Sequence, residues 1–504
     1  MYVVPARSLV PEELLAIAQA FYRLEQRKGR RLVVLTSGGA GLAENESPCD
    51  MAPYIAALKV IAQELSDLTC QSIDLSARWI EQPAELAALW AELAQTNPDR
   101  FVALRGHRRW RQQFAPLRLA HEQNSPRKLR EDGTYLITGG LGKVGLHLAD
   151  LLTRKYGARL ILSSRHAVDP AAAPHASALG RLHASGAELL VRKADVSDRA
   201  SMTSLLSEGN RRFGRIDGVL HAAGITSGDS IRKLIPQLTP EHFEEQFTPK
   251  VTGTLLLDEL LRDMELDFIL LFSSNASVLG GLGLMAYSAA CAFLDAFAEY
   301  KWRVGDRRWI SATWDGWRVT EEVKAGAQTS LDRYAMRPEE SIDAFERIVT
   351  ATPVPVTIVS SGDFGERARL WLEGTPETPS ADEAAPETAK RHDRSALSSA
   401  YVAPRDNVER AITLIWEDIL GISGIGVNDV FFDLGGHSLF ANRMVSRINE
   451  KLGVEFPLFK LFESPTVSGV TAIVRELKPA NTIPQTKRVK TQTLSQLMAK
   501  AQKK

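Results

Sequence analysis

A glycine-rich turn between a strand-like run and a helix-like run constrains the fold of this chain more than any other feature. The apolar run Thr134–Thr138 leads directly into Gly-Gly-Leu-Gly-Lys-Val-Gly, and a helical segment follows at once. Residues without a Cβ let the backbone approach a pyrophosphate, and the helix start offers unpaired N–H groups to it. We therefore expect a dinucleotide cofactor at this turn. The residues expected to hold it are Thr138, Gly139, Gly140, Leu141, Gly142, Val144 and Gly145.

Six more strand-like runs repeat the alternation of strand and helix over about residues 131–365. They are Arg159–Ser163, Glu188–Ala194, Gly218–Ala222, Asp267–Ser273, Ile310–Trp314 and Val356–Ser360. Near-continuous apolar strands of this kind are typical of a parallel sheet covered on both faces. Most connections hold a helical segment of ten or more residues, which is long enough for a right-handed crossover. The pattern predicts an α/β fold with a doubly wound Rossmann sheet.

Residues after the second, third and fourth runs complete the predicted cofactor site. Ser164 and Arg165 stand where an NAD enzyme usually carries an acidic residue, and an arginine there can pair with a 2′-phosphate, which favours NADPH. An ordinary surface arginine is the alternative. Asp195 and Val196 suit the adenine, and the small residues Ala222, Ala223 and Gly224 would let the nicotinamide ribose pass close to the backbone.

The length of the chain predicts several domains. A chain of 504 residues is too long for one hydrophobic core, and at about 150 residues per domain it would form about three. We expect a small α/β unit over residues 1–125, the dinucleotide-binding unit over 126–372, a flexible linker over 373–401, a helical bundle over 402–478 and a basic tail over 479–504.

The unit over 1–125 shows strand-like runs at Arg31–Thr36 and Phe101–Leu104, with helical segments at Pro53–Asp67 and Pro83–Leu93. Its glycine cluster, Ser37–Gly41, lacks the spacing of a dinucleotide turn, so no phosphate is expected there.

The second half of the chain contains the linker, the bundle and the tail. The linker is rich in Pro, Ala, Glu, Thr and Ser and cannot offset its ordering entropy by burial. Three helices are expected in the bundle, at Val408–Leu420, Leu439–Lys451 and Val467–Leu477. The tail ends in LSQLMAKAQKK, which is either a weak amphipathic docking helix or a disordered tail.

Composition excludes several classes of function. Lys+Arg and Asp+Glu both number 61, which argues against a nucleic-acid or membrane partner. The three cysteines are widely spaced, so we expect no disulfide framework and no zinc or other metal site. With no signal peptide and no apolar run near 18 residues, a soluble cytoplasmic protein is expected.

Ser274 and Tyr287 are thirteen positions apart, as in the short-chain dehydrogenase/reductase superfamily, which these segments resemble. That superfamily usually has Lys four residues after the Tyr, where this chain has Cys291. The chain more specifically resembles polyketide synthase ketoreductases, in which the Lys comes from the preceding helix, here Lys250. The segments that carry this resemblance are Thr248–Gly253, FSSNAS (272–277), YSAACAFLDAFA (287–298) and TWDGW (313–317). It covers residues 1–365 and implies that residues 1–125 form a non-catalytic, truncated Rossmann-like subdomain.

The resemblance implies a role for each catalytic side chain. Tyr287 would donate a proton to the forming alkoxide, Lys250 would lower the pKa of that phenol, and Ser274 would hydrogen-bond the carbonyl oxygen. Taken singly, Ser274 could be a turn residue and Lys250 a surface lysine. The family has Asn at Cys291, and a thiol is a weaker hydrogen-bond partner. We expect an active site, with a vestigial reductase as the alternative. The loop Ile225–Asp229 and Leu279 lack the family's stereochemical markers, so the product configuration stays open.

The string Asp433-Leu-Gly-Gly-His-Ser438-Leu439 resembles the attachment motif of acyl and peptidyl carrier domains. It implies that Ser438 carries 4′-phosphopantetheine, added by a phosphopantetheinyl transferase. Ser438 is also a good N-cap for a helix that begins at Leu439. His437, where many polyketide carriers have Asp, leaves the origin of the acyl group open.

The combined expectation is a polyketide synthase fragment that reduces a carrier-bound β-ketoacyl thioester with NADPH. It would depend on partner ketosynthase and acyltransferase domains. The alternatives are a carrier scaffold with an inactive reductase domain and a free-standing dehydrogenase for small alcohols.

Overall fold

The computed structural model divides the chain into two compact units, residues 1–324 with 331–387 and residues 325–330 with 388–504. The described residues are 2–3, 10–24, 29–42, 46–65, 68–96, 98–119, 129–166, 175–226, 228, 230–318, 334–373, 392–393, 401–431, 434, 438–454, 456–457, 460–461 and 464–477. The expected tail over 479–504 lies outside them. So does the expected linker over 373–401, apart from residues 373, 392–393 and 401.

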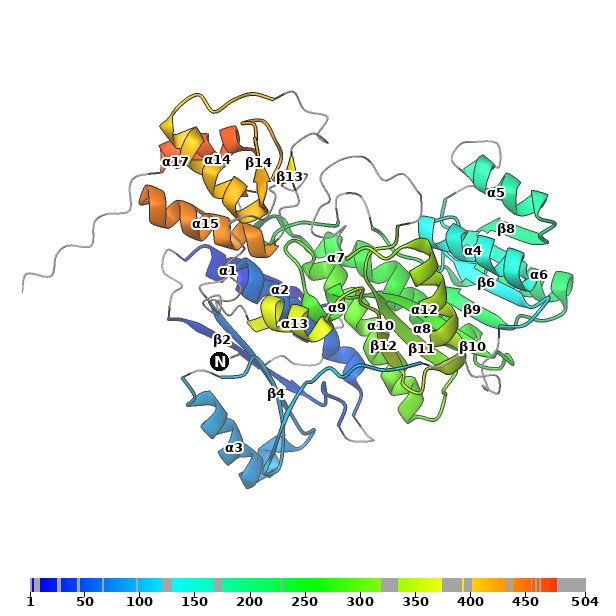
Figure 1. The fold of residues 1–504 in the computed structure, drawn as a ribbon. Coiled ribbons are helices and arrows are strands. Elements are labelled where there is room, and N and C mark those ends of the chain that lie inside the picture. The colour runs from blue at the N-terminus through cyan, green and yellow to red at the C-terminus, as the bar shows by residue number, and fades with distance from the viewer. Residues whose placement is uncertain are drawn as a thin grey trace, which may run out of the picture. The chain divides into compact units, whose positions relative to one another are not determined.

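A seven-stranded, wholly parallel sheet forms the centre of the first unit (Figure 1). Its strands are β6 (Thr134–Thr138), β7 (Arg159–Ser164), β8 (Leu189–Lys193), β9 (Gly218–His221), β10 (Phe268–Ser274), β11 (Trp309–Trp314) and β12 (Val356–Ile358). They lie in the order β12-β11-β10-β9-β6-β7-β8, so the chain reverses direction across the sheet between β6 and β9. This confirms the predicted doubly wound sheet, with strand ends within two residues of those expected.

Helices cover both faces of this sheet because every strand is apolar on both sides. In β6, Leu136 belongs to one core, whereas Tyr135 and Ile137 belong to the other, as the two-residue period of a strand requires. Packed on the Leu136 side are α6 (Arg199–Phe213), α7 (Pro240–Phe247), α8 (Gly253–Leu260) and α10 (Met285–Arg303). Packed on the Tyr135 side are α4 (Lys143–Tyr156), α5 (His175–Ala184) and α12 (Pro338–Ala351).

A second, five-stranded sheet is built from the first part of the chain. Its strands, in spatial order, are β1 (Tyr2–Val3), β2 (Arg31–Ser37), β3 (Thr69–Leu75), β4 (Phe101–Arg105) and β5 (Arg108–Arg111). The first four are parallel and β5 is antiparallel to β4. Its helices are α1 (Glu12–Tyr22), α2 (Ala52–Glu64) and α3 (Pro83–Leu93). The central strand β3 is an element that the sequence reading missed.

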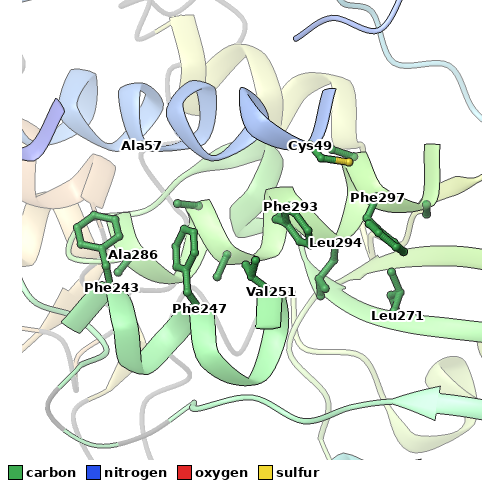
Figure 2. Close-up of a cluster of buried hydrophobic side chains, with 14 of the residues drawn as sticks. Cys49, Ala57, Phe243, Phe247, Val251, Leu271, Ala286, Phe293, Leu294 and Phe297 are labelled. Atoms are coloured by element: carbon green, nitrogen blue, oxygen red, sulfur yellow. The ribbon is translucent and has the colours of Figure 1, made fainter. Parts of the chain in front are cut away.

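Helix α2 packs along α10, so the two sheets of the first unit share one hydrophobic core. Figure 2 shows residues of this core: Ala57 of α2 and Cys49, in the short helix η1 (Pro48–Asp50) that precedes α2, belong to it together with Phe293 and Phe297 of α10. Ten of the thirteen residues of α2 are buried, which its sequence YIAALKVIAQE makes favourable at about 25 cal/mol per Å² of apolar surface. The described residues up to 119 therefore belong to one compact unit with the large sheet.

In the described residues of the second unit, helices α14 (Asn407–Leu420), α15 (Ser438–Leu452) and α17 (Val467–Glu476) lie close to the ranges expected. Its core includes an edge-to-face contact of Trp416 and Phe431, with ring centroids 4.9 Å apart. Helix α15 begins at Ser438, one residue before the expected start at Leu439.

Candidate functional site

The glycine-rich turn is shaped by close contacts that leave no room for side chains. Gly139 has a φ of +67°, and a Cβ there would lie 2.8 Å from the Cα of Ala223. A Cβ at Gly145 would lie 2.7 Å from the carbonyl oxygen of Gly139. Gly142 then caps α4 at its N-terminus in an extended conformation. The turn therefore needs glycine, and it brings the end of β6 against the end of β9.

The other expected cofactor residues lie at the carboxyl ends of neighbouring strands. Ser164 ends β7 and is partly buried, and the exposed Arg165 follows it. Asp195 follows β8 and accepts hydrogen bonds from the backbone N–H and hydroxyl of Ser197, at 2.9 and 2.6 Å. Val196 is buried against Gly253, where a Cβ would lie 2.8 Å from Val196 Cγ1. The glycine cradle (the turn Thr138–Gly145), the helix N-terminus that follows it and the cation at the next strand end fit a dinucleotide.

The three expected catalytic residues also meet on this side of the sheet. Ser274 is the last residue of β10, and Tyr287 lies in the first turn of α10. Lys250 lies in η4 (Thr248–Thr252), a single π-helical turn of the kind often found at functional sites. Its Nζ lies 5.7 Å from the centroid of the Tyr287 ring, and Ser274 hydrogen-bonds the Tyr287 hydroxyl.

Lys250 is buried, and its surroundings direct it toward this site. Its Nζ donates to the carbonyl oxygen of Phe272 at 3.1 Å. A Cβ at Gly224 would lie only 3.2 Å from Lys250 Cε and 3.3 Å from Nζ, so Gly224 leaves space for the lysine. Lys250 is therefore not a solvated surface lysine, which was the alternative.

The pKa of Tyr287 departs from the expectation. Burial raises it well above its usual value of 10.0, the neighbouring Cys291 acts in the same direction, and the hydrogen bond from Ser274 lowers it. Lys250, which was expected to lower this pKa, is not among its causes, and the loss of solvation dominates. Tyr287 therefore keeps its proton at neutral pH, as a proton donor must.

Cys291 and Asp295 follow Tyr287 at successive turns of α10. Cys291 is completely buried, and burial raises the pKa of its thiol. Asp295 accepts hydrogen bonds from Ser277 at 2.6 Å and Ser311 at 2.7 Å. Burial raises the pKa of Asp295 from 3.8 to about 6, against the opposing effect of the serines and Lys250. The sequence reading identified Cys291 as a departure but missed Asp295.

His221, the last residue of β9, is another functional candidate that the sequence reading did not single out. Its Nδ1 lies 2.7 Å from the hydroxyl of Thr138, which joins β9 to the cofactor turn. Burial and the positive charge of Lys250 lower the pKa of His221 from 6.5 to about 3. It is therefore neutral near Lys250. The sequence feature that could have identified His221 is a polar residue at the end of an otherwise apolar strand.

In the five-stranded sheet, the N–H groups of the glycine cluster that follows β2 are bound by a carboxylate of the chain itself. Asp74 of β3 accepts from the N–H groups of Gly39 at 2.7 Å and Ala40 at 3.0 Å. Arg105 then pairs with Asp74 at 2.6 Å and with Glu46 at 2.8 Å. The N–H groups that a phosphate would need are already bound, which supports the expectation that this turn holds no cofactor.

The expected attachment residue Ser438 is the first residue of α15. Its side chain and residues 432–433 and 435–437 lie outside the described residues. Among the residues that the structure does describe, no three His, Cys, Asp or Glu side chains are grouped to hold a metal ion. No helix in the described ranges is long and apolar enough to cross a membrane.

Comparisons with known families match both parts of the chain. Residues 133–319 match the family model of the KR domain, and residues 410–474 match the model described as phosphopantetheine attachment site. The first match contains the glycine-rich turn together with Lys250, Ser274 and Tyr287. The second contains Ser438.

Individual relatives agree with these two matches. Polyketide synthase PksM of Bacillus subtilis (strain 168) is 28% identical over 393 residues, which cover 75% of this chain and 9% of that protein. The 6-methylsalicylic acid synthase of Penicillium expansum is 26% identical over 488 residues, 87% of this chain and 25% of that protein. The chain thus spans a quarter or less of the length of these relatives.

Among solved structures, the first ketoreductase of the tylosin polyketide synthase superposes with a TM-score of 0.60 at 29% identity. The superposition covers 74% of this chain and 80% of that structure.

Proposed function

Because the chain carries a polyketide synthase ketoreductase domain followed by a phosphopantetheine carrier domain, we propose that it reduces a β-ketoacyl thioester to the β-hydroxyacyl thioester with NADPH. The acyl chain would be tethered to Ser438 through 4′-phosphopantetheine. The proposal includes the domain boundaries 1–125, 126–372, 373–401 and 402–478, with the first as the structural and the second as the catalytic subdomain. The observation that carries it is the convergence of Lys250, Ser274 and Tyr287 beside the glycine cradle.

The nicotinamide cofactor, when bound, supplies the hydride that adds to the ketone carbon. Ser274 would hydrogen-bond the carbonyl oxygen, which gains negative charge as the reaction proceeds. Tyr287 would then transfer its proton to that oxygen, because a forming alkoxide is more basic than a phenolate. The buried ammonium of Lys250, 5.7 Å from the phenol ring, would stabilise the phenolate left behind.

The residues proposed to bind NADPH are those of the cradle together with Ser164, Arg165, Asp195, Val196, Ala222, Ala223 and Gly224. Gly139 and Gly145 support this assignment because no side chain fits at either position. The exposed Arg165 supports the choice of NADPH over NADH, since a guanidinium can bind a 2′-phosphate with two hydrogen bonds.

Consumption of NADPH in the presence of a β-ketoacyl thioester tests the proposal. We expect the full chain to oxidise NADPH with a thioester mimic and Tyr287→Phe to lose at least about 99% of that rate, since general acid catalysis contributes 10²–10⁴-fold. NADPH binding by both proteins, without turnover by either on the mimic or on a carrier-bound substrate, would instead establish the carrier scaffold with an inactive reductase. NADP⁺-dependent oxidation of free small alcohols would indicate the free-standing dehydrogenase.

Mass spectrometry tests the carrier site. Incubation with coenzyme A and a phosphopantetheinyl transferase should add one phosphopantetheine to the wild-type chain and none to Ser438→Ala. A mass gain retained by that variant would contradict the assignment. The proposed partners are that transferase and the ketosynthase and acyltransferase domains that would load and extend the acyl chain.

A further inference from the structure

Side chains of α2 hold the backbone of the segment that joins Ser274 to Tyr287. This joining segment comprises residues 277–283. Gln63 is the centre of the contact: its Nε2 donates to the carbonyl oxygen of Leu279 at 2.7 Å, and its Oε1 accepts from the N–H of Gly281 at 2.7 Å. Lys59, one turn earlier in α2, donates from Nζ to the carbonyl oxygen of Ser277 at 3.2 Å. These bonds connect residues more than 200 positions apart in the chain.

The fit between Gln63 and the joining segment is close. The side-chain amide of Gln63 hydrogen-bonds the two peptide groups that flank Gly280, donating to one and accepting from the other, as the backbone of a neighbouring strand would. Gly280 has a φ of +73°, and a Cβ there would lie 2.8 Å from Gln63 Oε1. The joining segment therefore reaches Tyr287 along a path that depends on both glycine and Gln63.

Glu64 extends this contact to the segment that leads to Lys250. One carboxylate oxygen accepts from the N–H of Gly283 at 2.9 Å, and the other accepts from the N–H of Ile235 at 2.7 Å. Ile235 begins the short helix η3 (Ile235–Gln237), which precedes α7 and then the π-turn with Lys250. Gln19 of α1 holds the same helix by donating to the carbonyl oxygens of Ile235 and Leu238, at 3.0 and 2.9 Å.

We propose that Gln63 and Glu64 are positioning residues for ketone reduction, which they serve by fixing the approach of Tyr287 and Lys250 to Ser274. The inference rests on the proposed function and extends it to residues that have no contact role in that chemistry. Their bonds go to main-chain groups, so losing one leaves a buried N–H or C=O unsatisfied and lets the loop shift. A displacement of about 1 Å at a reacting group can lower a rate about a hundredfold.

Two substitutions in the full chain test this inference. Gln63→Ala removes both bonds to the joining segment, together with a longer one, at 3.2 Å, to the carbonyl oxygen of Trp371. Glu64→Gln keeps the shape of the side chain but turns an NH₂ group toward one of the two backbone N–H donors. We expect each variant to lower kcat about tenfold or more, while the dissociation constant for NADPH stays within about twofold of wild type, since β6 and α4 build the cofactor turn.

Two controls make the same chemical changes just before α3, in the part of the chain that forms the five-stranded sheet. Gln82→Ala removes an amide that donates to Ser76 Oγ at 3.2 Å, and Glu81→Gln removes a carboxylate paired with Arg78 at 3.9 Å. Both should keep wild-type kcat. Hydrogen–deuterium exchange adds a readout that does not require turnover: peptides covering 277–283 should exchange faster in the two test variants and at the wild-type rate in the controls.

The outcomes separate this inference from the proposed function. Unchanged kcat in both test variants, or a parallel loss of kcat, NADPH affinity and thermal stability, would overturn the positioning role. If the wild-type chain shows no turnover, the proposed function fails. Hydrogen–deuterium exchange then tests by itself whether Gln63 and Glu64 hold the joining segment. Unchanged exchange over 277–283 in both variants would then reject the inference, and faster exchange confined to that peptide and 235–238 would support it.

Discussion

Arg165 tests cofactor choice at the scale of one residue. It is exposed at the end of β7 and donates from Nε to His166 Nε2 at 3.1 Å, a contact that a phosphate could replace. We expect Arg165→Ala to weaken NADPH binding about tenfold or more, because a hydrogen bond to a charged group contributes about 1.5–3 kcal/mol. The affinity for NADH should change little. Titration of cofactor fluorescence measures both, and equal losses for NADPH and NADH would contradict the role of Arg165.

Burial should also make all three thiols unreactive in the folded chain. It raises the pKa of Cys49 and of Cys70 to about 12 and raises that of Cys291 as well. Alkylation requires the thiolate, so iodoacetamide at mildly alkaline pH should leave the native protein unmodified and should add three groups after denaturation. Mass spectrometry gives the count. Rapid alkylation of Cys291 in the native protein would contradict the complete burial of this thiol beside Tyr287.

At the scale of the element, α10 carries a buried carboxylate that should make stability depend on pH. The folded-state pKa of Asp295 is about 6, above its usual 3.8, so folding favours the protonated form. The stability that this form contributes is fully present below pH 3.8 and is lost as the pH rises through about 6. Asp295→Asn keeps a neutral group of the same shape and removes this loss.

We therefore expect Asp295→Asn to become more stable relative to wild type as the pH rises from about 4 to about 6. The measurement is the midpoint of urea denaturation of the variant and of the wild type, compared at several pH values in that range. Ser277→Ala, which removes one of the hydrogen bonds to the carboxylate, is a useful comparison because it keeps the titrating group. A constant difference between Asp295→Asn and wild type across these pH values would contradict the pKa shift.

Elements differed in how well their sequence predicted them, and the difference has a physical cause. The strands of the large sheet are apolar on both faces, so their sequence alone indicates a buried parallel sheet. Strand β3 contains Gln71, Ser72 and Asp74, which are all buried. Gln71 is satisfied by Glu92 at 2.9 Å and Asp74 by Arg105 at 2.6 Å. Such a strand is stable only once distant partners are in place, which local pattern does not reveal.

The candidate site divides in the same way. Ser274, Tyr287 and the glycine-rich turn follow from spacing and local motifs, and the Lys250 assignment came from the family resemblance. Gln63 and Glu64 belong to no motif, since what they bind is main chain about 170 to 310 positions away. The raised pKa of Tyr287 was also out of reach, because it depends on how much solvent the folded chain excludes.

At the scale of the whole molecule, the chain forms two compact units, residues 1–324 with 331–387 and residues 325–330 with 388–504. The Pro- and Glu-rich sequence after residue 373 predicts a linker without a core of its own. Limited proteolysis with a protease that cleaves after Glu should therefore cut first within 374–391 and release a reductase fragment and a carrier fragment. Cofactor binding should stay with the first fragment and the phosphopantetheine with the second. Early cleavage near residue 125 would argue against the single body formed by the two sheets.

The contact between α2 and the joining segment bears on how reductases can be exchanged between synthases. Because Gln63 and Glu64 bind main-chain atoms, this contact does not itself specify the side chains at 278, 279 and 282, whereas Gly280 must stay glycine. A recombination junction at about residue 125 would nevertheless pair one parent's α2 with the other parent's loop path. Only a crossover placed before β1 transfers the reductase together with its own α2. In shuffled libraries, chimeras joined before β1 should therefore keep activity more often than chimeras joined near residue 125.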